Sequence, residues 1–139
     1  MLGFMKTLLL SALLLLFSGL HALAFDRQFS IDGQTLYLNG EGPRKQAFLT
    51  VYDTALYLTE LGSDAQAIVA ADHPMAISLR VRSRFATAER ISEAFREGLV
   101  KSTGGDIEAI KPQADAFLRV FEQGVVKNDA FKFIYVPGE

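Results

Sequence analysis

The chain has 139 residues, is 50% hydrophobic and 22% charged, and carries a formal net charge of −2. This length and composition fit one globular domain and exclude long disorder, and the slight negative charge argues against a nucleic-acid partner. Because there is no cysteine and the histidines are His21 and His73 alone, disulfide frameworks, thiolate sites and histidine-built metal centres are excluded.

The first 24 residues have the pattern of a secretory signal peptide. A weakly basic start is followed by a nearly pure apolar run over residues 8–17, and the segment closes with Ala22-Leu23-Ala24. An apolar run of about ten residues before an A-x-A site is typical of a cleaved signal, whereas a membrane-spanning helix needs about 20 apolar residues. We therefore expect cleavage after Ala24, a periplasmic location, and a mature domain over 25–139 without a membrane span.

The first half of the mature chain predicts strands. Its expected elements are a weakly alternating segment at 25–31, a turn at Asp32-Gly33, a short strand at 34–38, a glycine-rich loop at 39–43 and a long strand at 47–58. The long strand is rich in β-branched and aromatic residues. Its alternation places Tyr52 on one face and Tyr57 on the other.

The second half mixes helices and strands. The expected elements are a helix at 64–71 with Asp64 near its N-cap, a strand at 76–84, a helix from Thr87 to Gly104-Gly105, a helix at 112–123, a turn at 127–129 and a strand at 130–136. These elements predict an α+β fold, in which helices pack on one side of an antiparallel sheet.

Motifs for catalysis or metal binding are weak. His73 precedes a proline in a predicted loop and is interpreted as a surface residue. Asp53 lies inside a strand, where a solvated face explains it better than an acid catalyst. The alternating Arg80, Arg82 and Arg84 favour an exposed sheet face that discourages edge pairing over an anion site. We expect no metal and no organic cofactor.

One constellation does indicate binding. Arg44 follows the glycine-rich stretch at the entrance to the long strand, and Tyr52 and Tyr57 lie farther along. A guanidinium presents a planar set of donors that matches a carboxylate, and a tyrosine hydroxyl adds one more donor at the end of an apolar ring. These residues would suit the head group of a fatty acid, although a surface arginine with core tyrosines is the alternative.

Several stretches together resemble the chalcone isomerase-like family, and its bacterial exported branch in particular. They are residues 38–44, 51–58, 84–99, and 131–138, which end in a Tyr-x-Pro-Gly turn. The resemblance implies an open-faced β-sandwich, with an antiparallel sheet under a layer of helices and a ligand cleft between them. Plant enzymes of this family cyclise chalcones to flavanones, and related members without that activity bind fatty acids.

The resemblance also implies which residues form the site. Family isomerases place an arginine after the glycine turn, which Arg44 matches, and a threonine on the next strand, where this chain has Tyr52. Their tyrosine, lysine and asparagine on the helix region correspond to Thr87, Arg90 and Ala94. Cyclisation needs donors where charge develops on the ketone oxygen, and most of these donors are replaced. An arginine with a tyrosine is what fatty-acid-binding relatives use to hold a carboxylate.

Two departures bear on this transfer. Arg44 and Tyr52 would lie about 26 Å apart on one straight strand at roughly 3.3 Å per residue, so they can share a ligand only if the chain folds back between them. Relatives also continue beyond the Pro-Gly turn, whereas this sequence stops at Glu139. We therefore expect the domain to be incomplete at its C-terminus.

Three functions remain open. The first is an exported, non-catalytic binder of a fatty acid or another apolar carboxylate, with Arg44, Tyr52, Tyr57, Thr87 and Arg90 as ligand-binding residues. The second is an isomerase, an intramolecular lyase of the chalcone-cyclising type. The third is an envelope interaction domain without a small ligand, whose cleft is filled by its own phenylalanines, of which the chain has 11.

Overall fold

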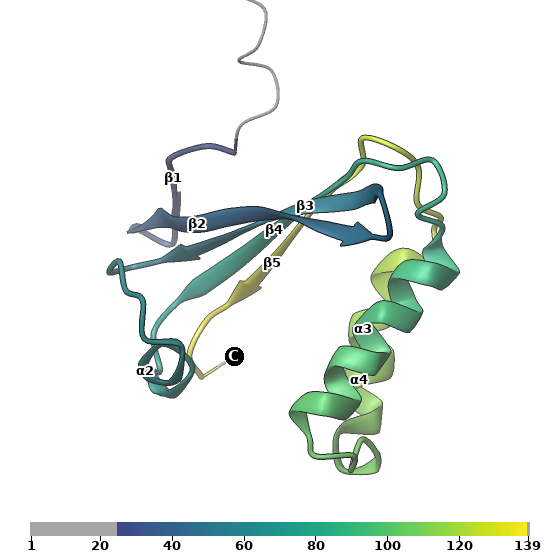
Figure 1. Ribbon diagram of the computed structural model, residues 1–139. Coiled ribbons are helices and arrows are strands. Elements are labelled where there is room, and N and C mark those ends of the chain that lie inside the picture. Colours follow the sequence, from purple (N-terminus) through teal and green to yellow (C-terminus); the bar gives the residue numbers. More distant parts are fainter. Residues whose placement is uncertain (1–24, 139) are drawn as a thin grey trace, which may run out of the picture.

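The computed structural model describes residues 25–138, so the predicted signal peptide lies outside the described residues. Figure 1 shows one antiparallel sheet with two long helices beside it. The strands follow one another in chain order: β1 (Gln28–Ile31), β2 (Gln34–Gln46), β3 (Leu49–Leu58), β4 (Met75–Val81) and β5 (Ala130–Tyr135). The helices are α2 (Ala65–Ala70), α3 (Ala88–Ser102) and α4 (Lys111–Leu118), with 3-10 turns at Glu108–Ile110 and Arg119–Phe121. The predicted α+β class is confirmed.

Two tight turns connect the first three strands. Asp32 and Gly33 both have positive φ, 48° and 82°, which is the backbone of the type I′ turn that the Asp-Gly pair predicts. The β2–β3 turn consists of Ala47 and Phe48, and Ala47 has a φ of 53°. The chain therefore reverses between Gln46 and Leu49, within the segment that the sequence predicts to be one strand from 47 onward.

The predicted loop at 39–43 is wrong, because β2 continues through it as far as Gln46. Gly40 and Gly42 are not among the glycines with positive φ, so they occupy ordinary extended backbone. Pro43 is tolerated because β1 pairs only with residues 34–37 of β2, which leaves the later part of β2 as an edge strand where a missing N–H is harmless. A register shift between Leu38 and Gly40 marks the irregularity that the glycines do produce.

The helix boundaries follow their caps. The Asp64 carboxylate accepts hydrogen bonds from the N–H groups of Gln66 and Ala67 at the start of α2, and the Thr87 hydroxyl accepts one from the N–H of Arg90 at the start of α3. After Ser102, Gly104 and Gly105 take positive φ and end α3, as predicted.

Strand β4 and helix α4 end several residues earlier than predicted. Strand β4 ends at Val81 instead of residue 84, since the N–H groups of Arg82 and Ser83 both bond to the Val51 carbonyl and turn the chain toward α3. The helix predicted at 112–123 is α4 up to Leu118, followed by a 3-10 turn.

The main core lies between the sheet and the pair α3 and α4, which run side by side on one face of the sheet (Figure 1). Leu79 and Val81 from β4 pack here against Ile91 of α3 and against Leu118 and Phe121. A network of phenylalanine rings fills the same layer, with centroid separations between 4.8 and 6.5 Å; its members are Phe95, Phe117, Phe121, Phe131 and Phe133. The helical layer is thus anchored by aromatic packing.

The opposite face of the sheet has a smaller core, over which the N-terminal strands curl. Leu36, Ala55, Tyr57 and Ala76 are buried there, with Phe29 packed against them. The alternation predicted for β3 is correct, because Ala55 and Tyr57 face this cluster. This face also carries the ion pair between Arg82 and Asp53, at 3.3 Å. The Asp53 carboxylate, which the sequence analysis assigned to a solvated face, is therefore paired with an arginine.

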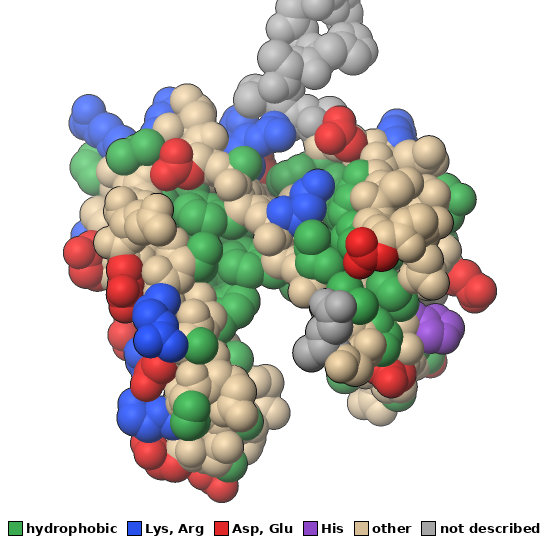
Figure 2. Space-filling model, turned by 180° about the vertical axis from the view of Figure 1, so that it is seen from behind, with side chains coloured by type: hydrophobic (Ala, Val, Ile, Leu, Met, Phe, Trp, Pro, Cys, Tyr) green, Lys and Arg blue, Asp and Glu red, His purple; other side chains and the backbone are tan. Residues whose placement is uncertain are grey.

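The space between the helices and the sheet is filled only in part. Figure 2 shows a hollow between the helical layer and the part of the molecule near α2, with hydrophobic side chains at its roof. On the helix-facing side of the sheet, Ile77 and Tyr135 remain 45% exposed. Within residues 25–138, no helix is long and apolar enough to cross a membrane.

Replacing Phe121 by alanine tests the aromatic anchor. The side chain is fully buried and touches three other rings, so Phe121→Ala should lower the free energy of unfolding by about 3–5 kcal/mol. Urea denaturation followed by circular dichroism measures this change. Val120→Ala, at an exposed neighbouring position, is the matched control and should cost no more than about 0.5 kcal/mol. Equal losses in both variants would contradict the proposed anchor.

Candidate functional site

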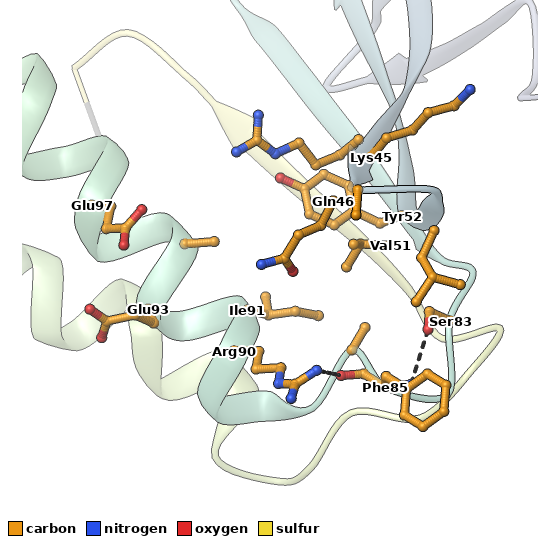
Figure 3. Close-up of a pocket in the computed structure, with 15 residues that line it drawn as sticks. Lys45, Gln46, Val51, Tyr52, Ser83, Phe85, Arg90, Ile91, Glu93 and Glu97 are labelled. Carbon is orange, nitrogen blue, oxygen red and sulfur yellow. Dashed lines mark hydrogen bonds between the residues drawn. The ribbon is translucent and has the colours of Figure 1, made fainter.

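A cavity of about 560 Å³ lies where the β2–β3 hairpin approaches the first half of α3 (Figure 3). Its apolar walls come from Leu49 and Val51 of the hairpin, Ala86 of the connection before α3, and Ile91 and Ala94 of α3. Ala86 and Ile91 are almost completely buried and belong to the main core. One side of the cavity is therefore a fixed part of the core.

The hairpin brings two of the predicted ligand residues together at this cavity. Arg44 and Tyr52 are directly opposed partners in the β2–β3 register, and both line the cavity. Opposed residues on antiparallel strands have Cα atoms about 4.5–5.5 Å apart, so the two side chains leave the same face of the sheet as neighbours. The chain thus folds back between Arg44 and Tyr52, as a shared ligand requires, and it reverses at Ala47-Phe48.

Side-chain directions distinguish the polar residues of the hairpin. In Figure 3, Tyr52 and Gln46 extend toward α3, whereas Lys45 points away from the cavity. Arg44 is exposed and Tyr52 is half-buried. The register shift between Arg44 and Lys45 opposite Val51 lets Val51 also contribute to the cavity wall.

Arg90 also lines the cavity, but one of its donors is engaged within the protein. Its Nη1 donates a hydrogen bond to the Phe85 carbonyl at 3.3 Å, as Figure 3 shows. This bond ties the start of α3 to the segment before it, and a guanidinium has further N–H groups for a ligand.

Thr87 and Tyr57 are not among the residues that line the cavity. The Thr87 hydroxyl caps α3 by accepting from the N–H of Arg90 at 3.4 Å. Tyr57 lies on the opposite face of the sheet, where its hydroxyl donates to the Asp26 carbonyl at 2.8 Å and its ring packs edge-on against Phe29. Both side chains therefore have structural roles in this arrangement.

Two acidic residues of the cavity were missed by the sequence analysis. Glu93 and Glu97 of α3 are also among the residues that line the cavity, and Figure 3 shows both on the side of α3 away from Gln46 and Tyr52. The signal was present, since residues 90, 93, 94 and 97 recur at helical spacing on one side of α3. The cavity lining thus has Arg44 and Lys45 on the hairpin, and Arg90, Glu93 and Glu97 on α3.

The cations at the cavity take part in no ion pair among the described residues. None of the ion pairs within residues 25–138 includes Arg44, Lys45 or Arg90. The same part of the chain holds no group of three or more acidic or histidine side chains that could bind a metal ion. An arginine beside a tyrosine above an apolar wall is suited to holding an organic anion with a nonpolar body.

Comparisons with known proteins bear on the fold. The sequence profile described as chalcone isomerase-like matches residues 18–139. The fold is similar to a crystal structure of the Arabidopsis thaliana fatty-acid binding protein AtFAP1, with a TM-score of 0.62 and 20% sequence identity over 82% of this chain and 69% of that one. A search of curated proteins gave no significant match. The expected open-faced fold is confirmed by the structural similarity.

Tyr57→Phe tests the structural role of this tyrosine. Burial, followed by the nearby carboxylates of Asp26 and Glu41, raises the pKa of Tyr57 above its ordinary value of 10.0. A raised folded-state pKa gives stability that is complete below the unfolded pKa and is lost as pH rises through the folded one. Wild-type stability should therefore fall above about pH 10 more steeply than that of Tyr57→Phe.

The same variant should cost about 1 kcal/mol at neutral pH, because the hydrogen bond to Asp26 is lost. Urea denaturation at several pH values between about 8 and about 11 measures both effects. Parallel stability profiles for the two proteins, or loss of ligand binding in Tyr57→Phe with unchanged stability, would contradict a purely structural role.

Proposed function

Because the chain belongs to the chalcone isomerase-like family, we propose that it binds a fatty acid or a similar apolar carboxylate without transforming it. The observation that carries the proposal is the pairing of Arg44 with Tyr52 at the mouth of a cavity with apolar walls. The guanidinium and the hydroxyl would donate to the carboxylate, and the chain of the ligand would contact Leu49, Val51 and Ile91. A solved structure with a similar fold is that of a fatty-acid binding protein.

The dimensions of the cavity support a small ligand. Ligand pockets usually enclose about 300–1,000 Å³, and this cavity has about 560 Å³. The phenylalanines do not fill it: five rings pack deeper, between α3, α4 and β5, and only Phe85 belongs to the cavity lining. This distribution favours a ligand over an interaction domain whose cleft is closed by its own rings.

Binding also explains the polar residues better than cyclisation does. Flavanone formation needs several donors aimed at one oxygen. Here the Thr87 hydroxyl caps α3, and Arg90 donates to the Phe85 carbonyl. Ala94 offers no polar group. Arg44 and Tyr52 remain as the paired donors of the hairpin, with the further N–H groups of Arg90 across the cavity. This set is enough for a carboxylate, but it lacks the threonine, tyrosine and asparagine of the family isomerases, whose positions hold Tyr52, Thr87 and Ala94.

The proposed setting of this activity is the periplasm. The apolar run at 8–17 and the Ala22-Leu23-Ala24 site indicate export and cleavage. Phe25, the first residue of the predicted mature chain, packs against the smaller core. An exported protein of this kind would carry its ligand outside the cytoplasm.

Arg44→Ala should weaken the binding of a long-chain fatty acid by at least about tenfold, since a hydrogen bond to a charged group contributes roughly 1.5–3 kcal/mol. Tyr52→Phe removes a neutral donor and should weaken binding by about fivefold. Calorimetric titration with one fatty acid measures both constants, and native mass spectrometry of the purified protein detects ligand that is retained from the cell.

Arg119→Ala is the control, because Arg119 is exposed and is not among the cavity residues; its affinity should equal that of the wild type. Binding that is unchanged in Arg44→Ala would refute the head-group assignment. Turnover of a chalcone above its spontaneous rate by the wild-type protein would instead support an isomerase.

A further inference from the structure

An exposed apolar surface lies at the end of the molecule where the cavity opens. Phe48 at the β2–β3 turn is 91% exposed, Leu49 beside it is 41% exposed, and Phe85 is 49% exposed. Leu49 and Phe85 both line the cavity, and the segment 82–83 is held against β3 by two hydrogen bonds to the Val51 carbonyl. We call Phe48, Leu49 and Phe85 the tip patch. In Figure 1 the β2–β3 turn lies beside the connection from β4 to α3.

The turn does not need this composition. Two-residue hairpin turns prefer Asn, Asp and Gly, because a positive φ is easy for them. Here Ala47 takes a φ of 53° and is followed by Phe48. The Phe48 ring is almost fully in solvent, so it adds nothing to the core while exposing a large apolar surface to water. Its position therefore suggests contact with something outside the chain.

Positive side chains surround the tip patch. Arg44 and Lys45 precede the turn on β2, Arg84 lies with its guanidinium 4.9 Å from the centre of the Phe85 ring, and Arg90 lines the same cavity. No ion pair within residues 25–138 includes any of these four cations. Because the whole sequence has a net charge of −2, the positive charge is a local feature.

Acidic groups near the tip patch lie on α3. Glu89 is in the first turn of that helix, and Glu93 and Glu97 are among the residues that line the cavity. They are on the helix side of the cavity, whereas Phe48 and Lys45 are on the hairpin that projects from the sheet. The hairpin side of this surface is therefore apolar and basic.

We propose that the tip patch inserts into the surface of a bilayer that contains anionic lipids. Aromatic and aliphatic side chains enter the interfacial region, and neighbouring lysines and arginines are attracted to the charge of an anionic surface. Three side chains, at the hairpin turn and on the connection before α3, present far less than the roughly 800 Å² per partner of a standard protein interface. The occupant that fits is thus a lipid surface, with weak and reversible binding.

This inference rests on the exposed surface and does not require a particular ligand in the cavity. If the proposed function also holds, insertion of the tip patch would place the opening of the cavity against the membrane, where free fatty acids are concentrated. The hairpin would then serve both to bind the bilayer and to present Arg44 at the point where a ligand enters.

The sequence offers a direct reporter, since the chain contains no tryptophan. Phe48→Trp introduces a single indole at the turn, and Val69→Trp introduces one at an 82% exposed position in α2 as the matched control. Both full-length variants are mixed with vesicles of phosphatidylcholine or of phosphatidylcholine and phosphatidylglycerol, each with and without brominated acyl chains. The readouts are the emission maximum and the quenching by bromine.

On the anionic vesicles, Phe48→Trp should shift to shorter wavelength and be quenched, with a much smaller effect on neutral vesicles, and Val69→Trp should change little. Because both variants carry residues 1–24, attachment through that segment alone would not distinguish them. Adding Lys45→Glu to Phe48→Trp should weaken binding to anionic vesicles by at least about fivefold.

Equal quenching of the two variants, or none in Phe48→Trp, would overturn the proposal. A blue shift that depends on protein concentration without vesicles would also overturn it, because it would assign the tip patch to a second copy of the chain. Tyr52→Phe separates this inference from the proposed function: it should weaken fatty-acid binding and leave vesicle binding unchanged. Vesicle binding without any fatty-acid binding would support the inference and refute the proposed function alone.

Discussion

The register of the β2–β3 hairpin is the constraint on which the site depends. Side chains alternate between the two faces of a sheet, so a slip of one residue would move Arg44 to the face opposite Tyr52. The two-residue turn at Ala47-Phe48 and the shift opposite Val51 together fix Arg44 against Tyr52. The same turn carries Phe48, whose side chain is 91% exposed. The proposed ligand site and the exposed Phe48 side chain therefore both depend on the β2–β3 hairpin.

The two faces of the sheet divide the tyrosines by role. Tyr52 and Tyr57 are separated by an odd number of positions on β3, so they project to opposite faces. On the helix side, Tyr52 meets the cavity and the aromatic core. On the other side, Tyr57 holds the N-terminal segment through the Asp26 carbonyl. The helix-facing side of the sheet therefore carries the residues of the proposed binding site, and the other side attaches the start of the domain.

Much of the fold could be predicted from local signals. The caps Asp64 and Thr87, the Asp32-Gly33 turn and the alternation of β4 are each encoded within a few neighbouring residues. Gly40 and Gly42 led to the wrong prediction of a loop at 39–43, because glycine is typical of turns. In the structure both residues lie in extended backbone along an edge strand. The pairing of Arg44 with Tyr52 depends on where the chain reverses, and neighbouring residues do not encode this position. The sequence therefore predicts only that the two side chains could share a ligand if the chain folded back between them. Glu93 and Glu97 became part of the site through packing of α3 against the hairpin.

A double-mutant cycle on Arg44 and Tyr52 tests the central claim that these two side chains hold one head group. The affinity for a single long-chain fatty acid is measured for the wild type, Arg44→Ala, Tyr52→Phe and the double variant. Residues that contact the same group couple by about 0.5–3 kcal/mol, so the double variant should lose less binding free energy than the sum of the single losses. Strict additivity of the two losses would show that the two side chains act independently and would contradict the account.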